Sequence, residues 1–97
     1  MSDPLVRLAA TDLQALLRAR LGHDAVSVRP HGKNLIVDVR DASGPEPVAR
    51  LVATGNGRWQ PGFRNHRGIW EPLPDGGDMA QAVDVLVDTL GPYLSPM

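Results

Sequence analysis

The residues of this chain that could recognise a ligand are concentrated between Gly55 and Pro74. This segment holds both tryptophans, the only phenylalanine and several cationic side chains. Aromatic rings and guanidinium groups are used for stacking and phosphate binding, but large aromatics are also what a small domain buries first. The candidate binding residues are Arg58, Trp59, Phe63, Arg64, Asn65, His66, Arg67 and Trp70.

No motif in the chain identifies a reaction. Ser43 and His66 supply residue types that a hydrolase needs, but the sequence contains neither a nucleophile elbow nor a phosphate-binding loop. Gly55 and Gly57 lie between two predicted strands, whereas a phosphate-binding loop opens a helix. We therefore expect no catalytic residue and a protein that is not an enzyme, with a small hydrolase as a remote alternative.

The three histidines, His23, His31 and His66, do not have the one-turn helical spacing of a metal motif. The chain has no cysteine, so disulfides and thiolate metal sites are excluded. We expect no metal and no cofactor. The absence of cysteine, and of an apolar run long enough for a signal peptide or a membrane span, favours a cytoplasmic protein without a membrane partner.

The charge is unevenly distributed along the chain. The net charge is −1, so nucleic acid could be attracted only by a local patch. Counting Lys and Arg against Asp and Glu gives +2 for residues 55–74 and −4 for residues 75–97. The acidic C-terminal segment could pair with these arginines within the fold, which would leave the basic segment solvated and without a ligand.

Apolar residues at helical spacing predict a helix near each end of the chain. The first helix ends at Gly22; its start is open, because either Asp3 or Thr11 with Gln14 could cap it. Its predicted apolar face consists of Leu5, Leu8, Ala9, Leu13, Leu16, Leu17 and Leu21. The second helix begins after Asp78 and stops at Gly91, and residues 93–97 are expected to form a loose tail.

Between the helices, alternating apolar residues predict a sheet. Strands are expected at 25–29 and 34–40 around a turn at 30–32, and at 48–54 after an unpaired loop, 41–47, that contains two prolines. A fourth strand would follow Asn56 and end at Pro61, and a fifth would span 68–73. The predicted fold class is therefore α+β: an N-terminal helix, an antiparallel meander of about five short strands and a C-terminal helix, with both helices on one sheet face, in a single globular domain of residues 1–97.

The length of the turn at Asn56 decides which face of the sheet Trp59 occupies. A two-residue turn pairs Trp59 with Thr54 on a half-polar face, and a three-residue loop pairs it with Ala53 on a small apolar face. Burying a tryptophan removes roughly 200 Å² from water, which is worth about 5 kcal/mol. We therefore expect at least one tryptophan in the core.

These observations favour a small non-catalytic interaction or adaptor protein. It would bind a protein partner through the sheet face and the segment Gly55 to Pro74. A partly open, apolar sheet face would also favour a homodimer. The alternative prediction is single-stranded nucleic-acid binding by the basic and aromatic segment.

Overall fold

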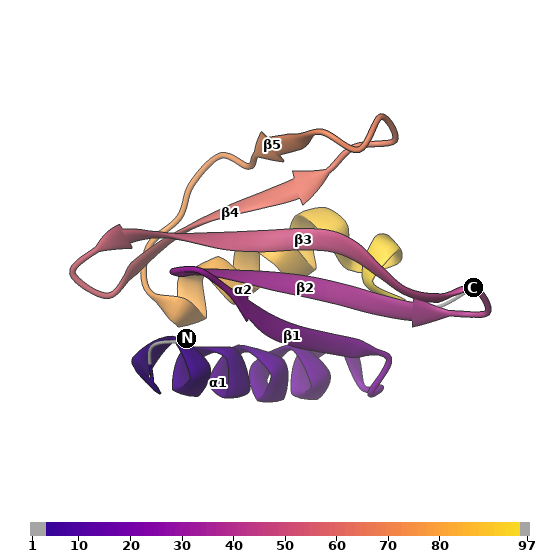
Figure 1. The fold of residues 1–97 in the computed structure, drawn as a ribbon, viewed down its shortest axis with the longest axis horizontal. Helices are drawn as coiled ribbons and strands as arrows, with labels where there is room; N and C mark the ends of the chain where they lie inside the picture. The colour runs from indigo at the N-terminus through magenta and orange to yellow at the C-terminus, as the bar shows by residue number, and fades with distance from the viewer. Residues whose placement is uncertain (1–3, 96–97) are drawn as a thin grey trace.

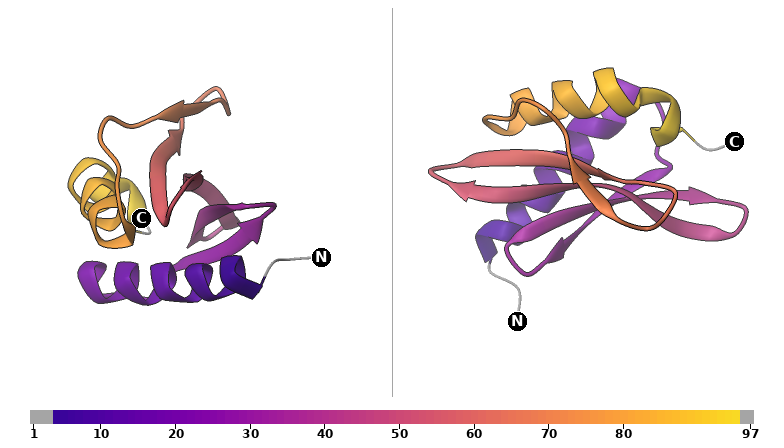
Figure 2. Two further views of the ribbon diagram at one scale, coloured as in Figure 1. Left: turned by 90° about the vertical axis from the view of Figure 1, so that its left-hand side faces the viewer. Right: turned by 90° about the horizontal axis from the view of Figure 1, so that it is seen from above.

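In the computed structural model, which describes residues 4–95, two helices pack against one face of a five-stranded sheet (Figures 1 and 2). All neighbouring strands are antiparallel and follow chain order, so the predicted α+β meander is confirmed. The elements are α1 (Pro4–Leu21), β1 (Val26–His31), β2 (Asn34–Asp41), β3 (Gly44–Gly55), β4 (Arg58–Arg64), β5 (Trp70–Pro72), α2 (Met79–Leu90) and the 3-10 helix η1 (Gly91–Leu94).

Helix α1 is the longer of the two predicted versions. It begins at Pro4, so Thr11 lies inside it, and the Thr11 hydroxyl donates to the carbonyl oxygen of Arg7. The alternative cap, Asp3, lies outside the described residues. Gly22 ends the helix with a positive φ of 78°, and its N–H donates to the carbonyl oxygen of Arg18 at 2.9 Å. Glycine suits this position because it enters the left-handed region without a steric penalty.

The predicted apolar face of α1 is partly wrong. The buried positions are Val6, Ala10, Leu13 and Leu17, a single stripe at helical spacing, whereas Leu5, Leu8 and Leu16 are exposed. One stripe suffices because α1 lies along β1 at the border of the sheet and also touches α2. The outer leucines lie on a different face of the helix from the buried stripe, and the exposed Asp12 lies between Leu8 and Leu16 on that face.

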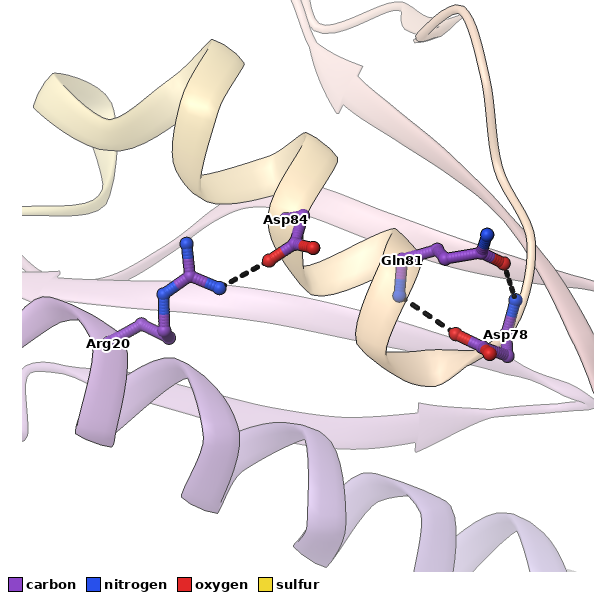
Figure 3. Close-up of polar contacts among 4 residues, drawn as sticks. All are labelled: Arg20, Asp78, Gln81 and Asp84. Carbon is purple, nitrogen blue, oxygen red and sulfur yellow. Dashed lines mark hydrogen bonds and ion pairs between the residues drawn. The ribbon is translucent and has the colours of Figure 1, made fainter.

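Helix α2 begins as predicted. The carboxylate of Asp78 accepts from the Gln81 N–H, and the Gln81 side chain accepts from the Asp78 N–H, both at 2.9 Å (Figure 3). This capping box satisfies two backbone donors that a helix start leaves without partners. One turn further on, Asp84 forms an ion pair with Arg20 of α1, so the two helices are linked at their exposed side (Figure 3).

The expectation of a loose tail is wrong for its first part. Gly91 keeps a right-handed helical conformation, with φ −44°, and the chain continues directly into η1. Leu94 is completely buried and belongs to the core cluster, whereas Tyr93 beside it is 69% exposed. Burial of one leucine therefore fixes this turn against the domain.

The predicted loop at 41–47 is a hairpin instead. Only Ala42 and Ser43 form the turn, and Pro45 and Pro47 pair with β2. The prolines are tolerated because β4 pairs with β3 only from Ala49 onward, so this part of β3 has β2 as its one neighbour. A bulge that leaves Val48 without a partner adjusts the register.

Two other prolines also lie inside strands rather than ending them. Pro30 belongs to β1, an edge strand, and the turn that follows is formed by Gly32 and Lys33. Pro61 lies in the middle of β4, where its carbonyl oxygen accepts from the Leu73 N–H at 2.9 Å. The backbone N and C=O of one strand residue face the same neighbouring strand. The N–H that Pro61 lacks would therefore face β5, and the hydrogen bonds between β3 and β4 are not interrupted.

Neither reading of the Asn56 turn is complete. Asn56 and Gly57 form a two-residue turn with φ values of 55° and 71°, but Thr54 is bulged out, because Ala53 pairs with Trp59 and Gly55 with Arg58. The bulge gives the register expected for the longer loop, and Trp59 lies on the helix side of the sheet. There it is half-buried against the core, so the expected tryptophan contributes to the core without being fully buried.

The core lies between the sheet and the two helices (Figure 2). Its fully buried members include Leu13, Leu17, Leu35, Leu51 and Leu86. Among residues 4–95, no helix is long and apolar enough to cross a membrane.

Candidate binding sites at the sheet end and on the open sheet face

The eight candidate binding residues do not form one surface. Because side chains alternate along β4, Trp59 and Phe63 face the helices, whereas Arg58 and Arg64 face the other side of the sheet. Trp70 of β5 pairs with Arg64 and shares its face. The remaining three candidates lie in the loop between β4 and β5.

This loop is organised by Asn65. The Oδ1 atom of Asn65 accepts from the N–H groups of Arg67 and Ile69, at 2.9 and 3.0 Å, and its carbonyl oxygen accepts from Gly68. Such a turn around an Asn side chain replaces regular backbone pairing. Asn65 therefore positions the loop, and His66 and Arg67 are held exposed on it.

A groove of about 770 Å³ lies between this loop and the C-terminal end of α2 with η1. Phe63, Leu73 and Leu90 are buried or half-buried members of its lining, and Ile69 and Tyr93 are exposed at its rim. It brings together five of the candidates predicted from sequence: Phe63, Arg64, Asn65, His66 and Arg67. Its other lining residues are Val48, Glu71 and Thr89.

A second groove of about 570 Å³ adjoins the first, because Val48 and Tyr93 line both. It extends to the β2–β3 hairpin, where Asp41 and Glu46 line it. In Figure 1 the β4–β5 loop, η1 and this hairpin all lie toward the right-hand end of the molecule. We call the two together the end groove; it is cationic at the β4–β5 loop and acidic at the β2–β3 hairpin.

The opposite face of the sheet carries no helix (Figure 2, left) and has a basic hollow of about 370 Å³. The guanidinium carbon of Arg50 lies 4.9 Å from the centre of the Trp70 ring, a cation–π contact. The hollow is lined by Arg29, His31, Asn34, Ile36, Pro47, Arg50, Arg64 and Trp70. The homodimer predicted from an apolar open face stays a prediction, and the hollow on this face is lined by charged and polar side chains together with Ile36, Pro47 and Trp70.

The acidic residues of α2 do not neutralise the candidate arginines. Within residues 4–95 the ion pairs are Arg20 with Asp84, and Arg29 with Asp38, whose Nε and Oδ2 atoms are 2.9 Å apart. Internal pairing of Arg58, Arg64 and Arg67 with α2, one of the outcomes considered above, is therefore not what the fold shows.

The histidines are separated in the fold. His23 follows α1, where its Nδ1 atom accepts from the Ala25 N–H at 3.1 Å; His31 ends β1, and His66 lies in the β4–β5 loop. In the part of the chain that the structure describes, no three His, Asp or Glu side chains are grouped to hold a metal ion. Ser43 and His66 line different halves of the end groove.

The candidate binding residues predicted from sequence did not include Tyr93 and Ile69 at the end groove, or Arg29 and Arg50 at the open face, although the alternation along β3 placed Arg50 on a half-polar face. Only the strand register brings Arg29 into the same row as Arg50, because both residues pair with Ile36 from opposite sides. No sequence pattern marks Tyr93 and Ile69, because their exposure depends on how the chain folds. Comparison of the chain with protein-family models, curated proteins and solved structures found no match.

Proposed function

We propose that this protein is a non-catalytic binding module that holds an extended segment of a partner protein in the end groove. The supporting observation is the combination of an apolar floor with two exposed apolar side chains, Ile69 (56% exposed) and Tyr93 (69% exposed), at its rim. Large apolar side chains that gather at a concave surface mark an interaction site more often than scattered ones do. The absence of cysteine favours a cytoplasmic setting for this function.

The apolar part of the groove would receive one or two anchoring side chains of the partner. Phe63 and Leu73 form a floor between β4, β5 and α2, and Tyr93 lies where the two halves meet. Burial of one Leu- or Phe-sized anchor contributes roughly 1.5–3 kcal/mol, which alone gives weak binding. A bound segment therefore has to use both halves of the end groove, which requires an extended conformation.

The charges at the two ends set the direction of the bound segment. Arg67 is exposed at the β4–β5 loop, whereas Asp41 and Glu46 lie at the β2–β3 hairpin. Complementary charge affects orientation and partner choice more than raw affinity. The matching segment carries acidic residues on the side of the β4–β5 loop, apolar residues in the middle and basic residues on the side of the hairpin.

A library of random linear peptides, displayed and selected against the full chain, tests this proposal. The selected peptides should share the order acidic, apolar, basic. Their affinity should fall about tenfold in Ile69→Ser, which corresponds to the loss of one well-packed contact. Arg67→Glu should weaken peptides with the acidic end and leave peptides without it unchanged.

Two matched controls separate the groove from the rest of the surface. Leu8→Ser removes an equally exposed apolar side chain (62%) from α1, and Arg7→Glu makes the same charge change there. Neither should alter peptide binding. The proposal fails if selected peptides share no such order, or if they bind both groove variants as tightly as the controls.

A further inference from the structure

We infer that the open face of the sheet is a second binding site, which takes single-stranded nucleic acid through Arg29, Arg50, Arg64 and Trp70. This goes beyond the proposed function, because these residues face away from the helices and belong to a separate hollow. Arg64 alone lines both the hollow and the end groove. The tests below therefore use Arg50 and Trp70, which belong to the hollow only.

The strand register places two arginines in one row across the sheet. Arg29 of β1 and Arg50 of β3 both pair with Ile36 of β2, so they are two strands, or about 10 Å, apart. Ile36 between them is buried although no helix covers this face. The aliphatic stems of the flanking arginines can cover it while their charged ends stay in water. The separation of Arg29 and Arg50 is between their backbones, and two cationic side chains that start from different strands can contact two phosphates along a single strand of nucleic acid.

Gly62 allows Arg50 to reach Trp70. It pairs with Arg50 in the same row, and a Cβ atom at this position would lie 3.7 Å from the Arg50 Cγ and 2.9 Å from the carbonyl oxygen of Glu71. Because glycine leaves the row bare on β4, the Arg50 side chain can extend toward β5 and lie over the Trp70 ring. The Arg50 guanidinium thus lies over one face of the Trp70 indole, and both groups line the hollow.

The hollow carries a net positive charge. Arg29, Arg50 and Arg64 line it, and Asp38 forms an ion pair with Arg29 that offsets the charge of that one residue. Arg50 and Arg64, which form no ion pair within residues 4–95, therefore supply the remaining charge. The acidic residues of α2 lie on the helix side of the sheet. The net charge of −1 thus conceals a local basic surface, which is what binding of phosphate groups requires.

The combination of Trp70 with arginines favours a single strand over a duplex. An aromatic or guanidinium plane can stack on a base only when that base is unpaired and unstacked from its neighbours. The hollow, at about 370 Å³, is at the lower end of small-ligand pockets and can hold part of a strand near one base.

Fluorescence anisotropy of a labelled oligothymidylate, titrated with the full chain at low salt, tests this inference. Binding should weaken steadily as salt rises, because released counterions drive it. Trp70→Leu should weaken it about tenfold, within the range for loss of one stacked base. Arg50→Gln should weaken it comparably, and Arg7→Gln, which removes the same charge from α1, should have no effect.

Additional variants and competitors in the same titration identify the class of ligand and distinguish this site from the end groove. Arg50→Lys keeps the charge but loses the planar guanidinium, so it should recover only part of the affinity. Ile69→Ser should leave oligonucleotide binding unchanged, and circular dichroism should confirm that each variant is folded. The inference is overturned by the absence of binding at low salt, by duplex DNA binding as tightly as the single strand, by displacement with equal concentrations of pyrophosphate, or by Arg50→Gln behaving like Arg7→Gln.

Discussion

Replacement of Leu94 by alanine tests whether η1 is a fixed part of the domain. Leu94 is 0% exposed and belongs to the core cluster, although it lies only three residues before the end of the sequence. The substitution removes three carbon groups, which at about 0.8 kcal/mol each gives roughly 2.4 kcal/mol of lost transfer energy. The cavity that remains adds to this, so we expect a loss of about 3 kcal/mol in the free energy of unfolding.

A loss of this size is large for a small domain. Domains are stable by about 5–15 kcal/mol, and 1 kcal/mol shifts the melting temperature of a chain this long by about 4–8 °C. We therefore expect Leu94→Ala to melt about 12–24 °C below the wild type. Urea unfolding followed by tryptophan fluorescence should show a lower midpoint with an unchanged slope.

Tyr93→Ala is the matched control for this substitution. Tyr93 lies in the same short helix but is 69% exposed, so its replacement should cost less than about 0.5 kcal/mol. The same control variant should weaken peptide binding, because Tyr93 lines both halves of the end groove. If Leu94→Ala is no less stable than Tyr93→Ala, then η1 is not anchored by Leu94 and the C-terminal wall of the groove is wrongly placed.

Two further predictions concern the start of α2 and a close contact in the sheet. Asp78→Ala should lower the free energy of unfolding by about 1 kcal/mol because the capping box is lost. Asp88→Ala, at an exposed position of the same helix, should leave it unchanged. Equal losses for the two variants in urea unfolding would show that the cap does not stabilise α2. Gly62→Ala should destabilise by about 1–3 kcal/mol because its Cβ would lie 2.9 Å from the Glu71 carbonyl oxygen. Gly91→Ala, where a Cβ atom meets open space at φ −44°, should raise the free energy of unfolding by up to about 1 kcal/mol. A thermal melt in which Gly62→Ala is more stable than Gly91→Ala would contradict the close contact at Gly62.

Local signals predicted the helix ends and the order of strands. The capping box at Asp78 and the stop at Gly22 depend on side-chain and backbone chemistry within a few residues, so they can be read without knowledge of the rest of the fold. The same is true of the presence of a turn at Asn56 and Gly57, whereas the sequence left its length and the strand register open. These positions needed no information about which elements pack together.

The strand limits at prolines were not predictable in the same way. Whether proline fits a strand depends on which neighbour its missing N–H faces, and that is a property of the sheet rather than of the segment. Pro45 and Pro47 lie where β3 has a single neighbour, and Pro61 turns its backbone toward β5. The prediction that Leu5, Leu8 and Leu16 belong to the apolar face of α1 was wrong for a related reason, since the width of the buried stripe depends on which elements cover the helix.

The alternation of side chains along β4 places the candidate residues of that strand on two different faces of the sheet. In sequence, Phe63 and Arg64 are adjacent members of one basic and aromatic segment, but adjacent strand residues face opposite sides of a sheet. The bulge at Thr54 then decides which side each takes, because a shift of one residue would exchange them. Phe63 therefore faces the end groove, whereas Arg64 shares the open face with Trp70 and lines both the hollow and the end groove. The basic and aromatic segment is thus divided between two surfaces of different chemistry, and the protein and nucleic-acid hypotheses, which compete in the sequence, become proposals for different surfaces of the fold.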